Sequence, residues 1–213
     1  MCHWGRFFLA HPRWHAVEVK EMENIYFISG PCGCGKSTLA DAYAKYMVKV
    51  EKRNQVYVIH GDDFHAGFVL RSYEEEDFWE NGQAANQIEW LEILKFNWEC
   101  IIDVAGKVLA RGLDVVIDYV VEDELPLLQK LAKENGAKLY YVVLTASAEA
   151  ITKRIQERGD VEMVERALFL KNKLEHLPEN QGHLYDNTGK TVEEEVAQLA
   201  NGGMEIYECK NIL

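Results

Sequence analysis

The chain has 213 residues, of which 48% are hydrophobic, and its formal net charge is −12. This length and composition fit one folded domain and exclude a disordered chain. Because an acidic protein repels phosphate backbones, we expect no binding to nucleic acid. No apolar run approaches the roughly 20 residues that span a bilayer, so we expect no membrane association either.

The cysteines indicate the cellular compartment, and the N-terminal residues indicate where the folded domain begins. Five cysteines, odd in number and irregularly spaced, do not suit a disulfide framework and favour the reducing cytoplasm. Residues 1–22 hold three His and two Trp but no fold-like pattern. We therefore expect a loosely ordered extension at 1–22, followed by a single domain at 23–213.

Apolar patterns in the chain alternate between the period of a strand and that of a helix. In chain order, strands are expected at 24–29, 55–60, 113–118, 139–145 and 183–186, with an edge strand at 204–207. Helices are expected at 36–52, 84–110, 122–135, 148–157, 161–176 and 191–200, and a loop or short helix at 64–82. This alternation predicts a parallel sheet with helices on both faces, which binds ligands beyond the carboxyl ends of its strands.

A phosphate-binding loop is predicted between the first strand and the first helix. The spacing Gly30-x-x-x-x-Gly35-Lys36-Ser37 is complete. In such a loop the backbone N–H groups point at one anion, the Lys reaches the outer phosphates, and the Ser hydroxyl ligates magnesium. The residues predicted to bind a nucleoside triphosphate are Gly30, Pro31, Cys32, Gly33, Cys34, Gly35, Lys36, Ser37 and Thr38.

The two cysteines inside this loop, Cys32 and Cys34, have two interpretations. The loop needs small side chains, and Cys is small. Alternatively, the positive charge of Lys36 and the helix N-terminus favour a thiolate, which allows a redox switch. We favour the first interpretation.

Carboxylates end the second and third predicted strands. Asp62 and Asp63 follow the second strand, and transfer of a phosphoryl group to an alcohol needs such a carboxylate to orient the hydroxyl. An acidic turn is the alternative. Asp118 ends the run Val115–Ile117, the arrangement of a Walker B strand, and we expect it to hold magnesium with Ser37 or to contact substrate. A helix cap is its alternative role.

A lid is predicted at about 152–178. Arg154 and Arg158 lie one helical turn apart on one face and are predicted to clamp the phosphoryl group during transfer. The alternative is a solvated helix face with salt bridges, which we prefer for Arg166 and Lys171.

A turn after the fifth predicted strand is the candidate base-binding loop. Asn187 and Thr188 lie in the stretch Asp186-Asn187-Thr188-Gly189, and their backbone groups could contact an adenine edge. A plain turn is the alternative.

With these motifs, the chain resembles the small P-loop kinases of the gluconate kinase, shikimate kinase and chloramphenicol phosphotransferase group, over residues 24 to about 200. The resemblance implies a three-layer P-loop NTPase fold, with a five-stranded parallel sheet in the order 2-3-1-4-5 and a small helical lid. It also implies that Asp62, or Asp63 as the close alternative, contacts the acceptor hydroxyl. Some relatives carry a further lid arginine where this chain has Val161.

The motifs together predict a phosphotransferase that uses ATP and magnesium and acts on a hydroxyl of a small molecule. A nucleotide or nucleoside kinase is one alternative, and an ATP-binding regulatory module without kinase activity is another. No guanine-binding signature is present, which favours ATP. Aromatic and acidic residues between 64 and 110 favour a neutral or cationic acceptor over a polyanionic one. We expect a monomer or a homodimer.

Overall fold

The computed structural model describes residues 23–68, 79–80, 83–84, 90–120 and 123–207. The predicted extension at 1–22 and much of the aromatic segment after Phe68 lie outside these residues. Among the described residues, no helix combines the length and the apolar character that crossing a membrane requires.

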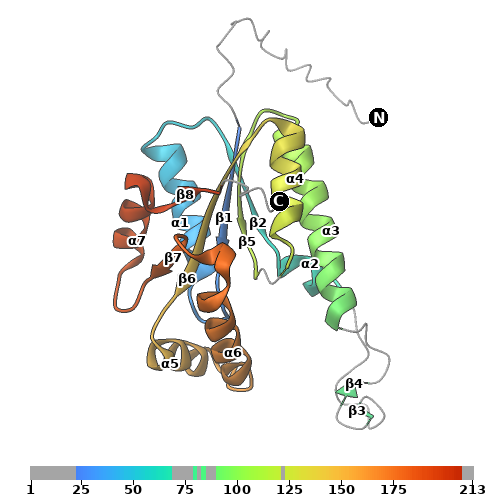
Figure 1. The fold of residues 1–213 in the computed structure, drawn as a ribbon, viewed down its shortest axis with the longest axis vertical. Helices are drawn as coiled ribbons and strands as arrows, with labels where there is room; N and C mark the ends of the chain where they lie inside the picture. The colour runs from blue at the N-terminus through green and yellow to red at the C-terminus, as the bar shows by residue number, and fades with distance from the viewer. Residues whose placement is uncertain (1–22, 69–78, 81–82, 85–89, 121–122, 208–213) are drawn as a thin grey trace, which may run out of the picture.

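A parallel sheet forms the centre of the molecule (Figure 1). Its strands are β1 (Asn24–Ser29), β2 (Val56–His60), β5 (Asp114–Asp118), β6 (Lys138–Thr145) and β7 (Leu184–Asp186). They lie in the order β2-β5-β1-β6-β7, so the predicted order 2-3-1-4-5 is confirmed. A short strand, β8 (Glu205–Ile206), pairs antiparallel with β6.

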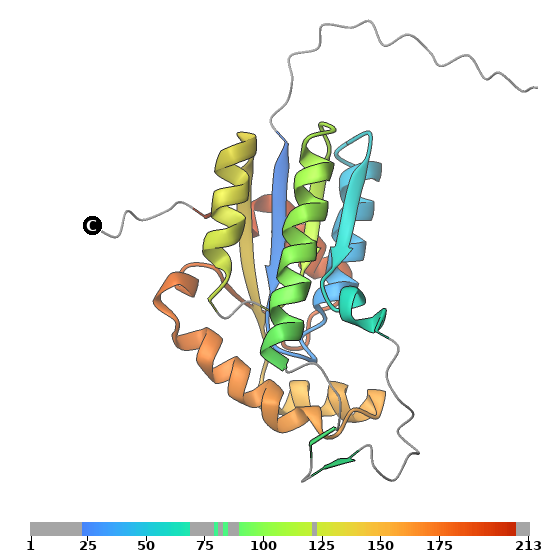
Figure 2. The same ribbon diagram turned by 90° about the vertical axis from the view of Figure 1, so that its right-hand side faces the viewer.

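Helices cover both faces of this sheet and make the predicted three layers (Figures 1 and 2). The helices are α1 (Lys36–Lys49), α2 (Asp63–Ala66), α3 (Trp90–Leu109), α4 (Leu125–Asn135), α5 (Ala148–Arg158), α6 (Met163–His176) and α7 (Val192–Gln198), with short turns at Pro178–Asn180 and Leu199–Gly203. Helices α1 and α7 lie on one face, and α3 and α4 lie on the other. Helices α5 and α6 lie together beyond the carboxyl ends of the strands, where the lid was predicted.

The strand β1 shows why the sheet needs helices on both sides. All six of its residues are buried, and successive side chains point to opposite faces. Ile25 and Phe27 pack in the core with α3 and α4, whereas Tyr26 and Ile28 pack in the core with α1. A strand buried on both faces reads as a continuous apolar run, which is why the sequence indicated it clearly.

The main departure from the predicted elements lies before α3. The helix expected at 84–110 is described from Trp90 to Leu109, and its expected start differs, because Gln83–Ala84 (β4) pairs antiparallel with Trp79–Glu80 (β3). The two residues between these strands in the sequence are Asn81 and Gly82, the pair that most favours a two-residue hairpin loop. The other helices differ from their expected bounds by one to three residues at their ends.

Packing between β2 and β5 fixes the backbone at the carboxyl end of the sheet. The N–H of Gly61 donates to the carbonyl of Asp118 at 2.9 Å. A Cβ added at Gly61 would lie 2.4 Å from the ring of Tyr119, which is buried. Only glycine therefore fits at this position, and the ring of Tyr119 determines where the chain runs into Asp62.

We expect Gly61→Ala to lower the free energy of unfolding by about 1–3 kcal/mol, because an added methyl group overpacks this site. The matched control is Gly67→Ala, since a Cβ there meets only a carbonyl oxygen at 3.6 Å. Urea unfolding of both variants measures the difference. Equal stability of the two variants would contradict this account of the packing.

Candidate nucleotide-binding site

The predicted phosphate loop connects β1 to α1, and close packing explains two of its three glycines. Gly30 has a φ of 144°, and a Cβ there would lie 2.6 Å from the carbonyl oxygen of Leu144 on β6. Gly33 has a φ of 80° and lies against Ile155 of α5. The loop can therefore curl against the sheet and α5 only without side chains at these positions, and it ends at the N-terminus of α1, where anions are favoured.

Lys36, Ser37 and Asp118 meet at the start of α1. The Nζ of Lys36 donates to the carbonyl of Pro31 at 3.3 Å, so the side chain lies back over the loop. The hydroxyl of Ser37 donates to Oδ2 of Asp118 at 2.7 Å. Asp118 is buried, and burial raises the pKa of its carboxyl, while the hydrogen bonds from Ser37 and His60 oppose the rise.

These oxygens suit magnesium. This ion takes few protein ligands and is usually completed by phosphate oxygens and water. In the described part of the chain, no group of three or more His, Cys, Asp or Glu could hold a metal by itself. Ser37 and Asp118 are the residues that could hold a metal bound mainly by phosphates.

The sequence analysis missed His60, the last residue of β2. Its Nδ1 makes a short hydrogen bond with Oδ1 of Asp118, and its Nε2 lies 3.5 Å from Oδ1 of Asp41 on α1. Burial lowers the pKa of His60, but the hydrogen bond and charge of Asp118 outweigh it and raise that pKa overall, with help from Asp41 and Asp63. His60 holds one oxygen of Asp118, so the other faces Ser37.

A cavity of about 620 Å³ lies between the phosphate loop and the lid. It is lined by Cys32, Gly33, Gly35, Lys36, Ser37, Thr38, Asp62, Val120, Arg158, Met163, Arg166 and Leu170. Asp62 thus shares one cavity with Lys36 and Ser37. Asp63 is exposed, begins α2 and is not among the lining residues.

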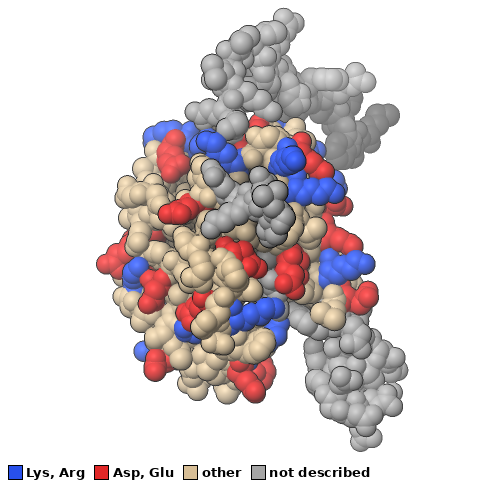
Figure 3. Space-filling view, in the orientation of Figure 1, with Lys and Arg blue, Asp and Glu red and all other residues tan. Residues whose placement is uncertain are grey.

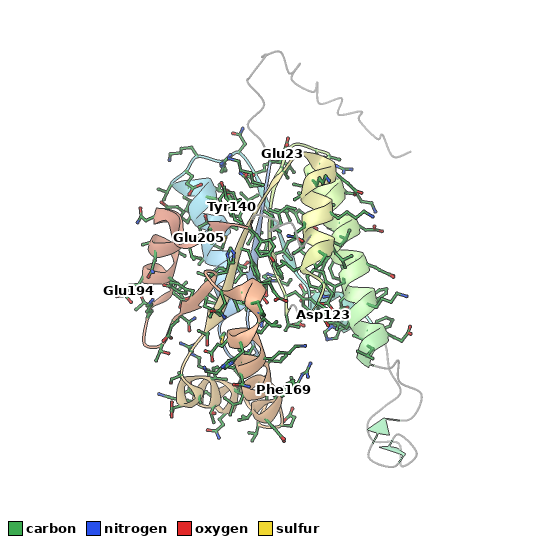
Figure 4. All side chains as sticks on the ribbon, viewed as in Figure 1. Glu23, Asp123, Tyr140, Phe169, Glu194 and Glu205 are labelled. Atoms are coloured by element: carbon green, nitrogen blue, oxygen red, sulfur yellow. The ribbon has the colours of Figure 1, made fainter. Side chains whose placement is uncertain are left out.

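The lid contributes two arginines to this cavity, and one of them differs from expectation. Arg158 donates to the Sγ of Cys32 at 3.1 Å and pairs with Asp160 at 3.0 Å. Arg166, which we expected on a solvated helix face, also lines the cavity. Its guanidinium lies 5.7 Å from the ring centre of Phe169, which is labelled in Figure 4. The spacing Met163, Arg166 and Leu170 along α6 is the helical signal that could have identified this face.

Cations gather here in a protein of net charge −12. On the face in Figure 3, Lys and Arg side chains are interspersed with Asp and Glu. The cavity instead combines Lys36 with Arg158 and Arg166, which is the charge that a triphosphate requires.

A second cavity, of about 370 Å³, lies on the other side of the phosphate loop and includes Arg154 and Asn187. Arg154 donates to Oδ1 of Asn187 at 3.1 Å and to the carbonyl of Gly33 at 3.4 Å. Unlike Arg158, it does not line the first cavity. Arg158 lines both cavities, so the two arginines predicted to act together share the second cavity, and only Arg158 also reaches the first.

Asn187 is 1% exposed, and its side chain is used within the protein. Besides accepting from Arg154, it donates to the carbonyl of Cys34 at 2.8 Å and to Oε2 of Glu195 at 3.2 Å. Its backbone N–H donates to the carbonyl of Thr145. Asn187 therefore joins the phosphate loop, the lid and α7, and it has no N–H left for a base.

The N–H and hydroxyl groups of Thr188 are also used in hydrogen bonds within the protein. Its backbone N–H and its hydroxyl both donate to Oδ1 of Asp186, at 2.8 and 2.6 Å, and its Oγ1 accepts from the N–H of Ser147. These bonds hold the turn that carries Asn187.

Comparison with known proteins identifies the family to which the fold belongs. A family model described as an AAA domain matches residues 27–176, and the chain belongs to this family. No curated protein matches the chain by sequence.

Solved structures of small kinases share the fold. An APS kinase from Mycobacterium tuberculosis, in complex with AMPPNP and APS, is 15% identical with a TM-score of 0.53, over 84% of this chain and 96% of that chain. A gluconokinase from Sinorhizobium meliloti 1021 is 16% identical with a TM-score of 0.50, over 85% and 92%. A sugar kinase from Janibacter sp. HTCC2649 is 14% identical with a TM-score of 0.54, over 84% and 93%. The predicted P-loop fold and the resemblance to small P-loop kinases are confirmed.

We expect Asn187→Ala to lower the free energy of unfolding by at least about 2 kcal/mol, because it leaves the buried carbonyl of Cys34 and the buried carboxylate of Glu195 without this partner. Asn201→Ala is the matched control, since Asn201 is exposed and bonds only the carbonyl of Ala197. Urea unfolding of the two variants provides the measurement. An equal, small effect of both would show that Asn187 is not the junction described above.

The thiol of Cys34 is not the reactive thiolate that a redox switch would need. Its side chain is fully buried, and burial raises its pKa to about 11 against the charges of Lys36 and Arg154. We expect iodoacetamide at pH 8 to leave Cys34 unmodified in the folded protein, because only about one thiol in a thousand is ionised there. Mass spectrometry of native and urea-unfolded samples measures the labelling. Equally rapid labelling in both samples would exclude the protected thiol.

Proposed function

We propose that the protein is a phosphotransferase that moves the γ-phosphoryl group of ATP, with magnesium, to a hydroxyl of a small molecule. The main support for this proposal is that Asp62 lines the same cavity as Lys36 and Ser37. A site that only binds nucleotide needs the phosphate loop alone. A carboxylate facing the outer-phosphate end of that loop is the group that transfer to an alcohol requires.

Each group has a distinct task in this proposal. The phosphate loop and Lys36 hold the triphosphate, and Ser37 and Asp118 hold magnesium, which neutralises charge on the phosphate oxygens. Asp62 orients the acceptor hydroxyl and accepts its proton as the acceptor oxygen bonds to phosphorus. The bond between that phosphorus and the bridging oxygen of ADP breaks in the same transfer, and Arg158 and Arg166 stabilise the charge on the moving group.

The walls of the first cavity constrain the acceptor. Besides Asp62 and the arginines, they include Val120, Met163 and Leu170. We propose an acceptor with an apolar part as well as a hydroxyl group, since apolar walls stabilise apolar surface taken out of water. A reducing compartment rich in ATP, such as the cytoplasm, suits this reaction and the free thiols of Cys32 and Cys34.

The first experiment is a thermal-shift screen of metabolites with a non-hydrolysable ATP analogue, because a ligand that binds the folded state raises its apparent stability. Compounds that shift the melting temperature then enter an ADP-release assay. If nucleotide binds but no compound raises ADP release above the acceptor-free rate, the kinase proposal fails and a regulatory module is favoured. A nucleoside or nucleotide among the active compounds would instead favour a nucleoside or nucleotide kinase.

With an active acceptor, we expect Asp62→Asn to lower kcat by about 100- to 10,000-fold, as for loss of a general base, and to leave the Kd of ADP unchanged. Asp63→Asn is the matched control, because this neighbour lies outside the cavity and should retain nearly full activity. Activity that survives Asp62→Asn but not Asp63→Asn would reverse the assignment.

A further inference from the structure

The second cavity is where the nucleoside of a bound nucleotide has to lie. The first cavity holds Lys36, Ser37 and Asp62 and so takes the outer phosphates and the acceptor. The two cavities share residues of the phosphate loop, and the second extends from the loop toward α7. A triphosphate that lies along the loop therefore brings its base into the second cavity.

A buried carboxylate lines this second cavity. Glu195 of α7 is 5% exposed, although it belongs to a helix whose neighbouring residue Glu194 lies at the outer side of the molecule (Figure 4). Its Oε2 accepts from Nδ2 of Asn187 at 3.2 Å. Among the described residues, no donor bonds its other oxygen, Oε1. Burial raises the pKa of Glu195, against the hydrogen bond from Asn187 and the charges of Arg154 and Lys190.

The other charged side chains around this cavity are engaged elsewhere. Arg154 is bonded to Asn187 and Gly33, and the Nζ of Lys190 lies 4.1 Å from the ring centre of Tyr185. Glu157 is exposed and pairs with Lys153 at 3.8 Å. Arg158, which also lines this cavity, pairs with Asp160 at 3.0 Å. Glu195 is therefore the buried charge of this cavity that keeps an acceptor oxygen to offer.

The chemistry of the bases decides what this oxygen can select. A guanine edge presents two adjacent N–H donors and takes a carboxylate through both of its oxygens, whereas the 6-amino group of adenine donates one hydrogen bond to one oxygen. Asn187 donates to Oε2, so Oε1 is the oxygen of Glu195 to which no described residue donates. A carbonyl at position 6 of a purine would place an acceptor against that oxygen.

We propose that Glu195 is the residue that selects adenine, by accepting a hydrogen bond from its 6-amino group through Oε1. This inference rests on the nucleotide binding that the proposed function assigns to the phosphate loop. It does not depend on the acceptor or on phosphoryl transfer. The charge and position of Glu195 thus separate ATP from nucleotides whose base lacks an amino group at position 6.

The test uses calorimetric titration of the full chain with magnesium and four ligands, without an acceptor. These are ADP, purine riboside 5′-diphosphate (which lacks only the 6-amino group), GDP and pyrophosphate. Wild type should bind ADP at least about tenfold more tightly than purine riboside diphosphate, because the lost hydrogen bond is to a charged group. It should also bind ADP more tightly than GDP.

Glu195→Gln is the informative variant, since it keeps the shape and an oxygen for Asn187 but turns an NH₂ group toward the base. We expect the ratio of affinities for ADP and purine riboside diphosphate to fall to about one. We also expect the affinity for GDP to rise relative to that for ADP. Glu193→Gln, an exposed residue of the same helix, should behave as wild type. An unchanged Kd of pyrophosphate and an unchanged melting temperature establish that the variant is folded.

Three outcomes would overturn the inference: equal binding of ADP and purine riboside diphosphate by wild type, a full preference retained in Glu195→Gln, or tighter binding of GDP than of ADP. The last outcome would assign the carboxylate to guanine instead. If the expected ADP preference is found while no acceptor ever raises turnover, the kinase proposal fails and Glu195 keeps its role. If an acceptor raises turnover but ADP is not preferred, the kinase proposal stands and the role of Glu195 in selecting adenine is excluded.

Discussion

The buried side chain of Asn187 is the junction on which the nucleotide side of the molecule depends. A primary amide offers two donors and an acceptor in a fixed plane, and here all three are used, on the phosphate loop, α7 and the lid. The loop also packs through Cys34, which is fully buried in the core that includes residues of α1. The hydrogen bonds of the amide add directional links from the loop to α5 and α7, two helices that line the second cavity.

On the opposite side, neighbouring parallel strands bring the polar groups together. His60 and Asp118 are paired in register at the ends of β2 and β5, and Ser37 reaches the same carboxylate from α1. Residues distant in sequence meet because the carboxyl ends of parallel strands share one edge. Their contacts keep the carboxylate oriented before any ligand binds, which is the preorganisation that charge stabilisation in a transition state needs.

The sequence predicted the positions of the strands and the phosphate loop because both have strong local signals, whereas the order of the strands came from the resemblance to small P-loop kinases. Val115–Ile117 is a continuous apolar run, and the glycine spacing of the loop, between a strand and a helix, is specific to phosphate binding. His60, Arg166 and Glu195 were not found, because their meaning comes from tertiary partners that lie in other elements. A His at the end of a strand or a Glu in the first turn of a helix is ordinary in sequence terms. Only the cavity that each one lines or supports distinguishes it.

Gly61 and Tyr119 fill one space between them, with the ring of Tyr119 taking the volume that a side chain at position 61 would need. Two residues that share a fixed volume are not free to change independently. Among related chains, we expect these two positions to vary together, with a side chain at position 61 only where the residue at position 119 is smaller. Such covariation would reflect the same spatial constraint that here determines the position of the backbone leading into Asp62.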